Sequence, residues 1–528
     1  MFTPSNRGGY ARWHTVLDVV VILAISLVAE GAHLSVRQGR AILCGDSAQH
    51  ADGAEALLSD DKTPNFGFRK PGYTLILAGI LALTGEISWH AIVLNHLLLA
   101  LLPAAAYGLG YNLHSRVAGW VAALFTIAQL QGALWGGRIM TEASYTCVMT
   151  FGVLAFAVGL NRRRVGAWMI AGGVLLAYAW LIRAIGIAVI VAAVGVLVWS
   201  FRRERRRALT LSTCLLMPLV AAVLVECGLN LKSSGRFRTS TASLGIMLQN
   251  RARYLLGLPF PDTETTRWFL DLLPERDPES AYLANKLDGC VARHRAIRDR
   301  GMDEWTFDAV AVRSGIETLA AAPKAYLKSG AEVFVRHLLR RNGGPSLSGV
   351  PPEDRLPIIV HEAAPSFRES QEYWYAYWFL PHRSVDESTA LVARMREAAE
   401  KRAPFGRSPF WDTFRYLSTL PVVVDTLGVI RGVASLWPGF ALIFCGLLGL
   451  NRRTCGLLAC AYVLEALIIA VCGSTDVANE RYQFVWLATD TALAACLVTP
   501  VIRVGAAHVA RLWARPQESP PKAAGASI

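Results

Sequence analysis

The chain has 528 residues, of which 53% are apolar and 18% are charged, and its mean hydropathy is +0.35. This composition excludes an ordinary soluble enzyme, because apolar runs of about 17–25 residues are long enough to cross a bilayer as helices. The formal net charge of +13 comes largely from arginine clusters in short loops, and no soluble fold accompanies them, so nucleic acid is excluded as a partner.

Ten apolar runs are predicted to be membrane-spanning helices. In chain order they cover residues 14–34, 88–111, 117–135, 141–160, 165–182, 184–201, 208–231, 434–450, 454–472 and 484–502. The first run is predicted to be retained as a helix, because no small-residue cleavage pattern follows it. The chain is therefore predicted to be an all-α polytopic membrane protein with about ten transmembrane helices.

Basic residues in the short loops predict the orientation of these helices. They gather in alternate loops, as at 162–164, 202–207 and 452–453, and such loops face the cytoplasm. Both termini are therefore predicted to be cytoplasmic in a bacterial inner membrane.

The same topology divides the chain into three units. Residues 1–231 form an N-terminal transmembrane catalytic module with a first outer loop at 35–87. Residues 232–417 form an outer-face, periplasmic segment, in which helical spacing predicts helices at 280–300 and 303–340. Residues 418–528 hold the C-terminal transmembrane helices and a cytoplasmic tail.

The cysteine and histidine spacings do not predict a metal site. The chain has no C-x-x-C and no H-x-x-x-H, which are the usual ligand spacings. No metal and no other cofactor is therefore predicted. Cys44 and Cys290 lie in the outer compartment, where disulfides persist, and the sequence leaves open whether they pair.

A short polar stretch follows the first apolar run. It begins with Gly45-Asp46-Ser47 and ends with Arg69-Lys70-Pro71-Gly72-Tyr73, just before apolar sequence resumes. A base beside phosphate-binding cations is what an enzyme with a lipid-phosphate substrate needs. Simpler interpretations remain: Asp46 as a helix N-cap, and the two cations as residues that reach the lipid headgroups.

Four pieces of sequence carry a resemblance to a known family. They are Gly45-Asp46-Ser47, Arg69-Lys70-Pro71-Gly72-Tyr73, Met140-Thr141-Glu142-Ala143 with Leu181-Ile182-Arg183-Ala184-Ile185-Gly186, and Glu480-Arg481-Tyr482-Gln483-Phe484. In this order they resemble the GT-C glycosyltransferases that use polyprenyl-phosphate sugars, which include the protein O-mannosyltransferases and the lipid A aminoarabinose transferases. The match covers about 1–210 and 475–500; the family often has proline where this chain has Gly72 and Ala184.

The resemblance implies a GT-C-like fold, a short helix that begins near Asp46, and a surface helix after Lys70. It also implies a membrane glycosyltransferase that moves a sugar from a polyprenyl-phosphate donor to a glycan, lipid or protein acceptor on the outer face. Asp46 would be the catalytic base, and Lys70 and Arg481 would bind the donor phosphate. Further donor-binding candidates are Arg69, Tyr73 and Arg183, and additional site candidates are His50, Glu142, Arg138 and Tyr482.

His50 and Glu142 also have structural interpretations. His50, one turn after Asp46, would share its helix face, and the simpler expectation is a solvated histidine at the membrane interface. Glu142 would be stabilised by the dipole at a helix N-terminus.

A polytopic transporter or lipid flippase is the alternative function, because such proteins also carry charges within their spans. In this chain the polar residues gather at the outer helix ends, apart from Glu226 and Glu465. A non-catalytic envelope scaffold is a third interpretation, and it would tolerate replacement of Asp46 and Lys70.

Overall fold

The computed structural model describes residues 10–36, 43, 45–59, 66–127, 136–161, 165–241, 244–250, 261–272, 281–328, 331, 380–401 and 499. The secondary-structure elements within these ranges are all α-helices. The predicted all-α class is therefore confirmed for the described part of the chain. The predicted spans 434–450, 454–472 and 484–502 lie outside it, residue 499 apart.

Seven helices correspond to the first seven predicted spans. They are α1 (Tyr10–Val36), α4 (Ser88–Leu113), α5 (Arg116–Ile127), α7 (Thr141–Asn161), α8 (Val165–Ile182), α9 (Gly186–Ser200) and α10 (Arg205–Ser234). By length and composition α1, α4, α7 and α10 can each cross a membrane, whereas α5, α8 and α9 are shorter apolar helices. The protein is thus a membrane protein.

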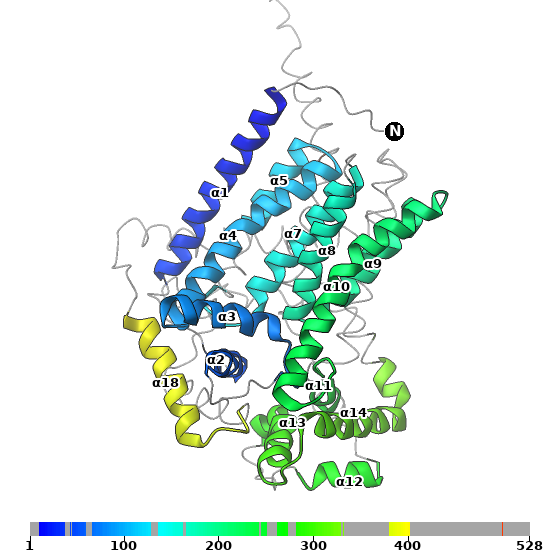
Figure 1. Cartoon of the computed structure of the whole chain (residues 1–528). Coiled ribbons are helices and arrows are strands. Elements are labelled where there is room, and N and C mark those ends of the chain that lie inside the picture. The colour runs from blue at the N-terminus through cyan, green and yellow to red at the C-terminus, as the bar shows by residue number, and fades with distance from the viewer. Residues whose placement is uncertain are drawn as a thin grey trace, which may run out of the picture.

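These helices form a bundle in which α4 packs against α1, α5 and α7, and α8 packs against α7, α9 and α10. Gly173 allows the close approach of α8 to α10, because a Cβ there would lie 2.5 Å from the carbonyl oxygen of Leu215. The α9–α10 turn, which carries the arginine cluster at 202–207, lies at the end of the bundle opposite α2 and α3 (Figure 1). The structure therefore separates the arginine-rich turn from the predicted outer loop.

Two helices from the first predicted outer loop, α2 (Gly45–Leu58) and α3 (Pro71–Thr84), lie at that other end. In Figure 1, α3 runs across the end of the bundle and α2 lies next to it. Pro71 occupies the first turn of α3, where its fixed φ suits a helix start. Gly85 ends α3 with a φ of +73°, and its N–H donates to the carbonyl of Leu81 at 2.8 Å. Both predicted helices are confirmed.

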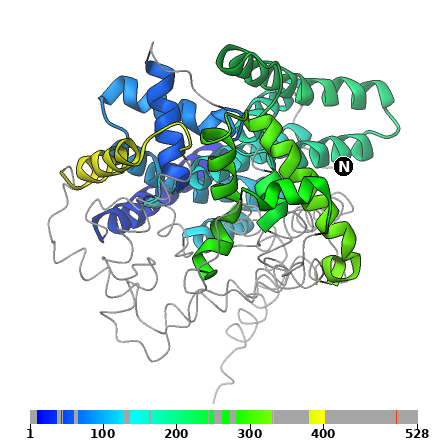
Figure 2. The ribbon, with the colours of Figure 1, turned by 90° about the horizontal axis from the view of Figure 1, so that it is seen from below.

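The predicted outer-face segment contributes five described helices. They are α11 (Leu244–Asn250), α12 (Glu264–Leu270), α13 (Ala281–Arg298), α14 (Glu304–Ala321) and α18 (Val385–Lys401). Figure 2 shows α11–α14 together at the end where α10 finishes. The helix predicted at 280–300 is α13. The helix predicted at 303–340 is interrupted: α14 ends at Ala321, because Pro323 disfavours a helical conformation at Ala322. Helical residues resume at 323–328 and at 331, and residues 329–330 and 332–340 lie outside the described part of the chain.

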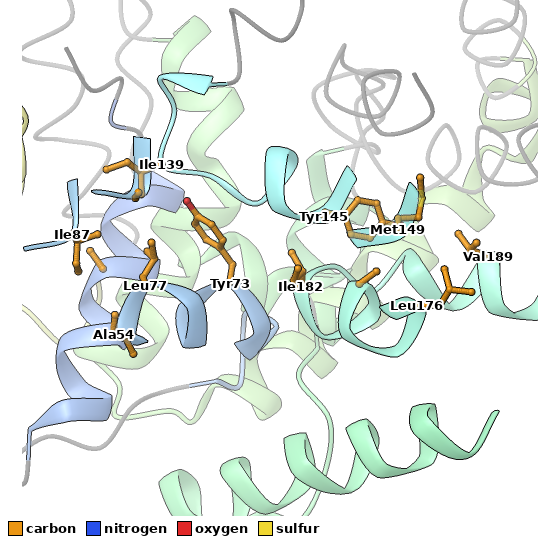
Figure 3. Close-up of a cluster of buried hydrophobic side chains, with 14 of the residues drawn as sticks. Ala54, Tyr73, Leu77, Ile87, Ile139, Tyr145, Met149, Leu176, Ile182 and Val189 are labelled. Carbon is orange, nitrogen blue, oxygen red and sulfur yellow. The ribbon is translucent and has the colours of Figure 1, made fainter. Parts of the chain in front are cut away.

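The largest buried apolar cluster joins α2 and α3 to the bundle. Tyr73, Leu77 and Ile182 lie in it together with Tyr145 and Leu176 (Figure 3). A second cluster joins α11, α12, α13 and α14, and Phe68 from the α2–α3 connection is part of it. The polar residues of the first outer loop are thus held between two packed cores.

The second cluster also settles the state of one cysteine. Cys290 on α13 is a free, buried thiol, and burial raises its pKa to about 11. Cys44, the partner that the sequence left open, lies outside the described residues.

Candidate functional site

Three consecutive residues before α3 point toward three different parts of the protein. Phe68 is buried in the cluster of the outer helices, Arg69 reaches α2, and Lys70 reaches α10. Lys70 has an extended backbone, with φ −63° and ψ 138°, as expected before a proline. Successive side chains of extended backbone point to opposite sides, so this short connection can contact several elements.

Asp46, the predicted base, pairs with Arg69. Asp46 lies in the first turn of α2, where the helix dipole favours negative charge. Arg69 Nη2 donates to Asp46 Oδ1, and Arg69 Nε donates to Gln49 Oε1 at 2.9 Å. The Asp46 side chain is 13% exposed and the Arg69 side chain is 29% exposed. Asp46 therefore combines a stabilising cation with access from outside, as a base that meets an incoming substrate requires.

Lys70, the predicted phosphate ligand, is paired with Glu226 of α10. Its Nζ donates to both carboxylate oxygens of Glu226, at 3.0 and 2.8 Å. The same ammonium lies 3.7 Å from the centre of the Trp180 ring on α8. Glu226 is also fixed from the other side, because the backbone N–H of Ser240 donates to it at 2.9 Å. The lysine thus contacts α10 and α8, and Ser240 helps to fix its partner Glu226.

This pair is almost dry, since the Lys70 and Glu226 side chains are only 6% and 0% exposed. Burial lowers the pKa of the Lys70 ammonium, and the Glu226 charge and hydrogen bond oppose that shift. An ammonium has three N–H donors, and Glu226 accepts from two of them. The buried ammonium is therefore compensated by one buried carboxylate.

Tyr73 and His50 pack against each other between α2 and α3. Their rings meet edge to face with centroids 5.1 Å apart, and His50 Nδ1 lies 3.0 Å from Thr74 Oγ1. Both rings are buried. The expectation of a solvated interfacial histidine is therefore wrong, because α3 packs on the face of α2 that carries His50. These two residues fix α2 against α3.

Arg183 and Glu142 form a third ion pair. Arg183 Nη1 donates to Glu142 Oε1 at 3.1 Å, and its guanidinium lies 5.8 Å from the Tyr145 ring. Glu142 lies in the first turn of α7, as predicted, and Arg183 lies in the tight α8–α9 connection. This pair joins the start of α7 to the end of α8.

Gly72 packs against the backbone at the end of α8, just before Arg183. A Cβ at Gly72 would lie 2.6 Å from the carbonyl carbon of Leu181, so only glycine fits against the end of α8. The carbonyl of Gly72 accepts from the Tyr178 hydroxyl at 3.1 Å. Arg183 follows directly after this contact. The departure from the family's proline at position 72 thus has a packing reason.

The remaining site candidates are Arg138, Arg481 and Tyr482, and the structure describes the first of them. The carbonyl of Arg138 accepts from Asn95 Nδ2 at 2.8 Å, which fixes the backbone before α7. Arg481 and Tyr482 lie outside the described residues. Their convergence with Asp46 and Lys70 stays a prediction.

The structure adds residues that the sequence did not select. Glu226 stood out only as a lone carboxylate within an apolar run, and that isolation was its one signal. On the far half of α2, Arg383 donates to Asp52 at 2.6 Å and to Glu55 at 2.9 Å. Arg394 of α18 donates to Glu55 at 3.1 Å. The outer-face segment therefore contacts the helix that carries Asp46, and spacing in the sequence could not indicate this.

His, Cys, Asp and Glu side chains are the usual protein ligands of metal ions. Within the described ranges, these side chains form no group of three or more that could hold an ion. The prediction of a metal-free site stays a prediction.

Part of this chain matches one known protein family. Residues 64–226 match the family described as dolichyl-phosphate-mannose-protein mannosyltransferase. A search of curated proteins finds no match.

Two solved structures illustrate the more distant similarity. The crystal structure of ArnT from Cupriavidus metallidurans bound to undecaprenyl phosphate is 16% identical, with a TM-score of 0.34, over 81% of this chain and 80% of that one. An oligosaccharyltransferase from Archaeoglobus fulgidus is 15% identical, with a TM-score of 0.33, over 87% of this chain. The chain spans 56% of that enzyme's length.

The matched segment contains Arg69, Lys70, Glu142, Arg183 and Glu226. It therefore covers the Lys70–Glu226 and Arg183–Glu142 pairs and the arginine partner of Asp46. The resemblance to the GT-C glycosyltransferases that use polyprenyl-phosphate sugars is confirmed over residues 64–226 of this chain.

Proposed function

We propose that the protein transfers a sugar from a polyprenyl-phosphate donor to an acceptor at the end of the bundle where α2 and α3 lie. The observation that carries this proposal is the succession Asp46–Arg69–Lys70. A partly open carboxylate is paired with one cation, and the adjacent residue is a second, buried cation. Arg69 and Lys70 are consecutive residues, so one short connection joins the carboxylate of Asp46 to the buried cation.

The reaction follows from these roles. A hydroxyl oxygen of the acceptor attacks C1 of the sugar while the bond between C1 and the phosphate oxygen breaks. Asp46 takes the hydroxyl proton, which a positioned carboxylate does with a typical gain of about 10²–10⁴ in rate. The phosphate leaves as polyprenyl phosphate, and Lys70 and Arg69 stabilise the charge that it gains. The cations perform the charge neutralisation that a metal performs elsewhere.

Two further features support the proposal. The matching family's description names a sugar carried on a lipid phosphate and a protein acceptor. The helices α11–α14 and α18 surround the same end of the bundle (Figure 2), where they would shape the acceptor site. We place this end in the periplasm and the protein in a bacterial inner membrane, because the arginine-rich α9–α10 turn lies at the opposite end. Arg481 and Tyr482 remain proposed donor ligands.

The transporter alternative rested on charge within the spans. Glu226 was the main such charge in the first half of the chain, and it is neutralised by Lys70 near the outer end of α10. A polar site near mid-membrane is what a transporter would need. The geometry at Glu226 therefore supports the transferase rather than the transporter.

The test is sugar transfer by the purified protein in lipid nanodiscs. Radiolabelled polyprenyl-phosphate sugars are supplied together with an envelope extract, and the label is followed into glycan, lipid and protein fractions. We expect transfer from one donor class, abolished by Asp46→Asn. Asp262→Asn is the matched control, because that carboxylate is 86% exposed on the outer-face segment. No transfer from any donor would overturn the proposal.

A further inference from the structure

Glu226 is a buried carboxylate that the reaction itself does not use. It is 0% exposed and lies in a helix that is otherwise apolar enough to cross a membrane. An ionised carboxylate is costly to bury. Its two oxygens contact one ammonium, at 3.0 and 2.8 Å, and one of them also accepts the Ser240 N–H at 2.9 Å. The position of this carboxylate is therefore fixed by two segments.

The groups around Lys70 show what its ammonium would lose without Glu226. Trp180 on α8 offers a ring face at 3.7 Å, which attracts a cation but carries no charge. The thiol of Cys227, next to Glu226 on α10, is the other titratable group that acts on Lys70. On α8, the Tyr178 hydroxyl is turned to the Gly72 carbonyl. Glu226 is thus the carboxylate that compensates the buried lysine among the described contacts.

We propose that Glu226 is a positioning residue for donor binding: it keeps the buried Lys70 charged and aimed at the donor phosphate. The inference rests on the proposed function, since Lys70 must bind that phosphate. An ammonium already removed from water needs no further dehydration when the phosphate arrives. Such preorganisation strengthens binding, because the ammonium loses its water when the protein folds and not when the phosphate binds.

A purely structural salt bridge and a positioning residue predict different pH profiles. Burial lowers the pKa of Lys70, and the Glu226 charge counters that effect. In Glu226→Gln the lysine would lose its proton at a lower pH. Donor affinity would then fall at alkaline pH but remain near the wild-type value at acidic pH. A structural role predicts the same loss at every pH.

The experiment measures binding of undecaprenyl phosphate by the full chain in phosphatidylcholine nanodiscs from pH 6 to 9. For Glu226→Gln we expect the alkaline loss of affinity to begin at a pH about one unit or more lower than in wild type. At a fixed alkaline pH, the affinity of the variant would then be lower than that of wild type by about tenfold or more. Asp18→Asn is the matched control, because Asp18 is a buried carboxylate paired with Arg116 between α1 and α5. Its profile should parallel that of wild type.

A second pair of variants keeps the inference testable if Glu226→Gln folds poorly. Arginine stays charged even when it is buried, so Lys70→Arg should remove the alkaline loss. In the Lys70→Arg background, the ratio of donor affinity at pH 6 to that at pH 9 should change by less than about threefold when Glu226→Gln is added. If the pH profile of donor affinity for Glu226→Gln parallels that of wild type, the inference about Glu226 is wrong and the proposed function is unaffected. Absence of undecaprenyl phosphate binding by the wild type would overturn both the inference and the proposed function.

Discussion

Arg69 donates to Asp46 across 23 residues of sequence and so joins the connection before α3 to the first turn of α2. The same guanidinium lies 5.0 Å from the ring of Phe68, whose other neighbour is Arg293 of α13 at 4.0 Å. The candidate base is thus linked through one arginine to the core of the outer helices. A guanidinium stabilises the ionised carboxylate, which is the form that accepts a proton.

Asp46→Asn should abolish turnover with little effect on donor binding. The amide keeps the shape and a hydrogen bond to Arg69 but cannot accept the proton, so kcat should fall by about 10²–10⁴. Single-turnover transfer and undecaprenyl phosphate binding, measured side by side, separate the two effects. Activity within about tenfold of wild type would mean that Asp46 only stabilises α2.

Lys70→Met should weaken donor binding and also destabilise the protein. It leaves Glu226 as an unpaired buried carboxylate, and breaking one partner of such a pair costs about 3–5 kcal/mol. The double change Lys70→Met with Glu226→Leu should recover much of the stability, because apolar replacements of a buried pair are often neutral. Donor binding should not recover. Thermal unfolding and donor affinity of the three variants check this; recovery of affinity in the double variant would contradict phosphate binding by Lys70.

Gly72→Ala should force α3 away from the end of α8. The new methyl group would lie 2.6 Å from a backbone carbon of Leu181, and overpacking of this kind costs about 1–3 kcal/mol. Gly79→Ala is the matched control on the same helix, because a Cβ there meets nothing within 4 Å. It should be neutral or stabilising by up to about 1 kcal/mol. Equal melting temperatures for the two variants would show that the contact at Gly72 can relax.

Arg383→Ala should loosen the contact between α2 and the outer-face segment. Arg383 is largely buried and donates to both Asp52 and Glu55, and hydrogen bonds to charged groups contribute about 1.5–3 kcal/mol each. Hydrogen exchange in α2 and residues 385–401 should increase. Arg394→Ala, which removes a 59% exposed partner of Glu55, should have little effect because exposed pairs contribute about 0–1 kcal/mol. A similar increase in both variants would argue against a special role for Arg383.

The contact between α11 and α14 should depend on pH. Burial raises the pKa of Asp308 to about 6, although its carboxylate accepts the Gly245 N–H at 2.9 Å. The folded state then binds more protons than the unfolded state between about pH 4 and 6, so stability falls as pH rises through that window. Exchange-corrected protection of residues 244–250 should be higher at pH 5 than at pH 7.5. Asp308→Asn should remove the difference, and an unchanged difference would assign it to another group.

The sequence by itself determined what depends on neighbouring residues along the chain. Hydropathy located seven helices of the bundle, and proline and glycine set local limits, as with Pro71 at the start of α3 and Gly85 at its end. The starts of α2 and α7 followed from short motifs around Asp46 and Glu142. These features are readable because helix formation and its ends are governed by residues within about one turn.

Only the tertiary structure decided which charges meet. Lys70 pairs with Glu226, 156 residues later, and Arg383 pairs with Asp52, 331 residues earlier. His50 is buried because α3 covers it. No local pattern encodes such partners, since the packing of distant helices determines each pair. A charge can be buried at tolerable cost only when that packing places its counter-charge beside it.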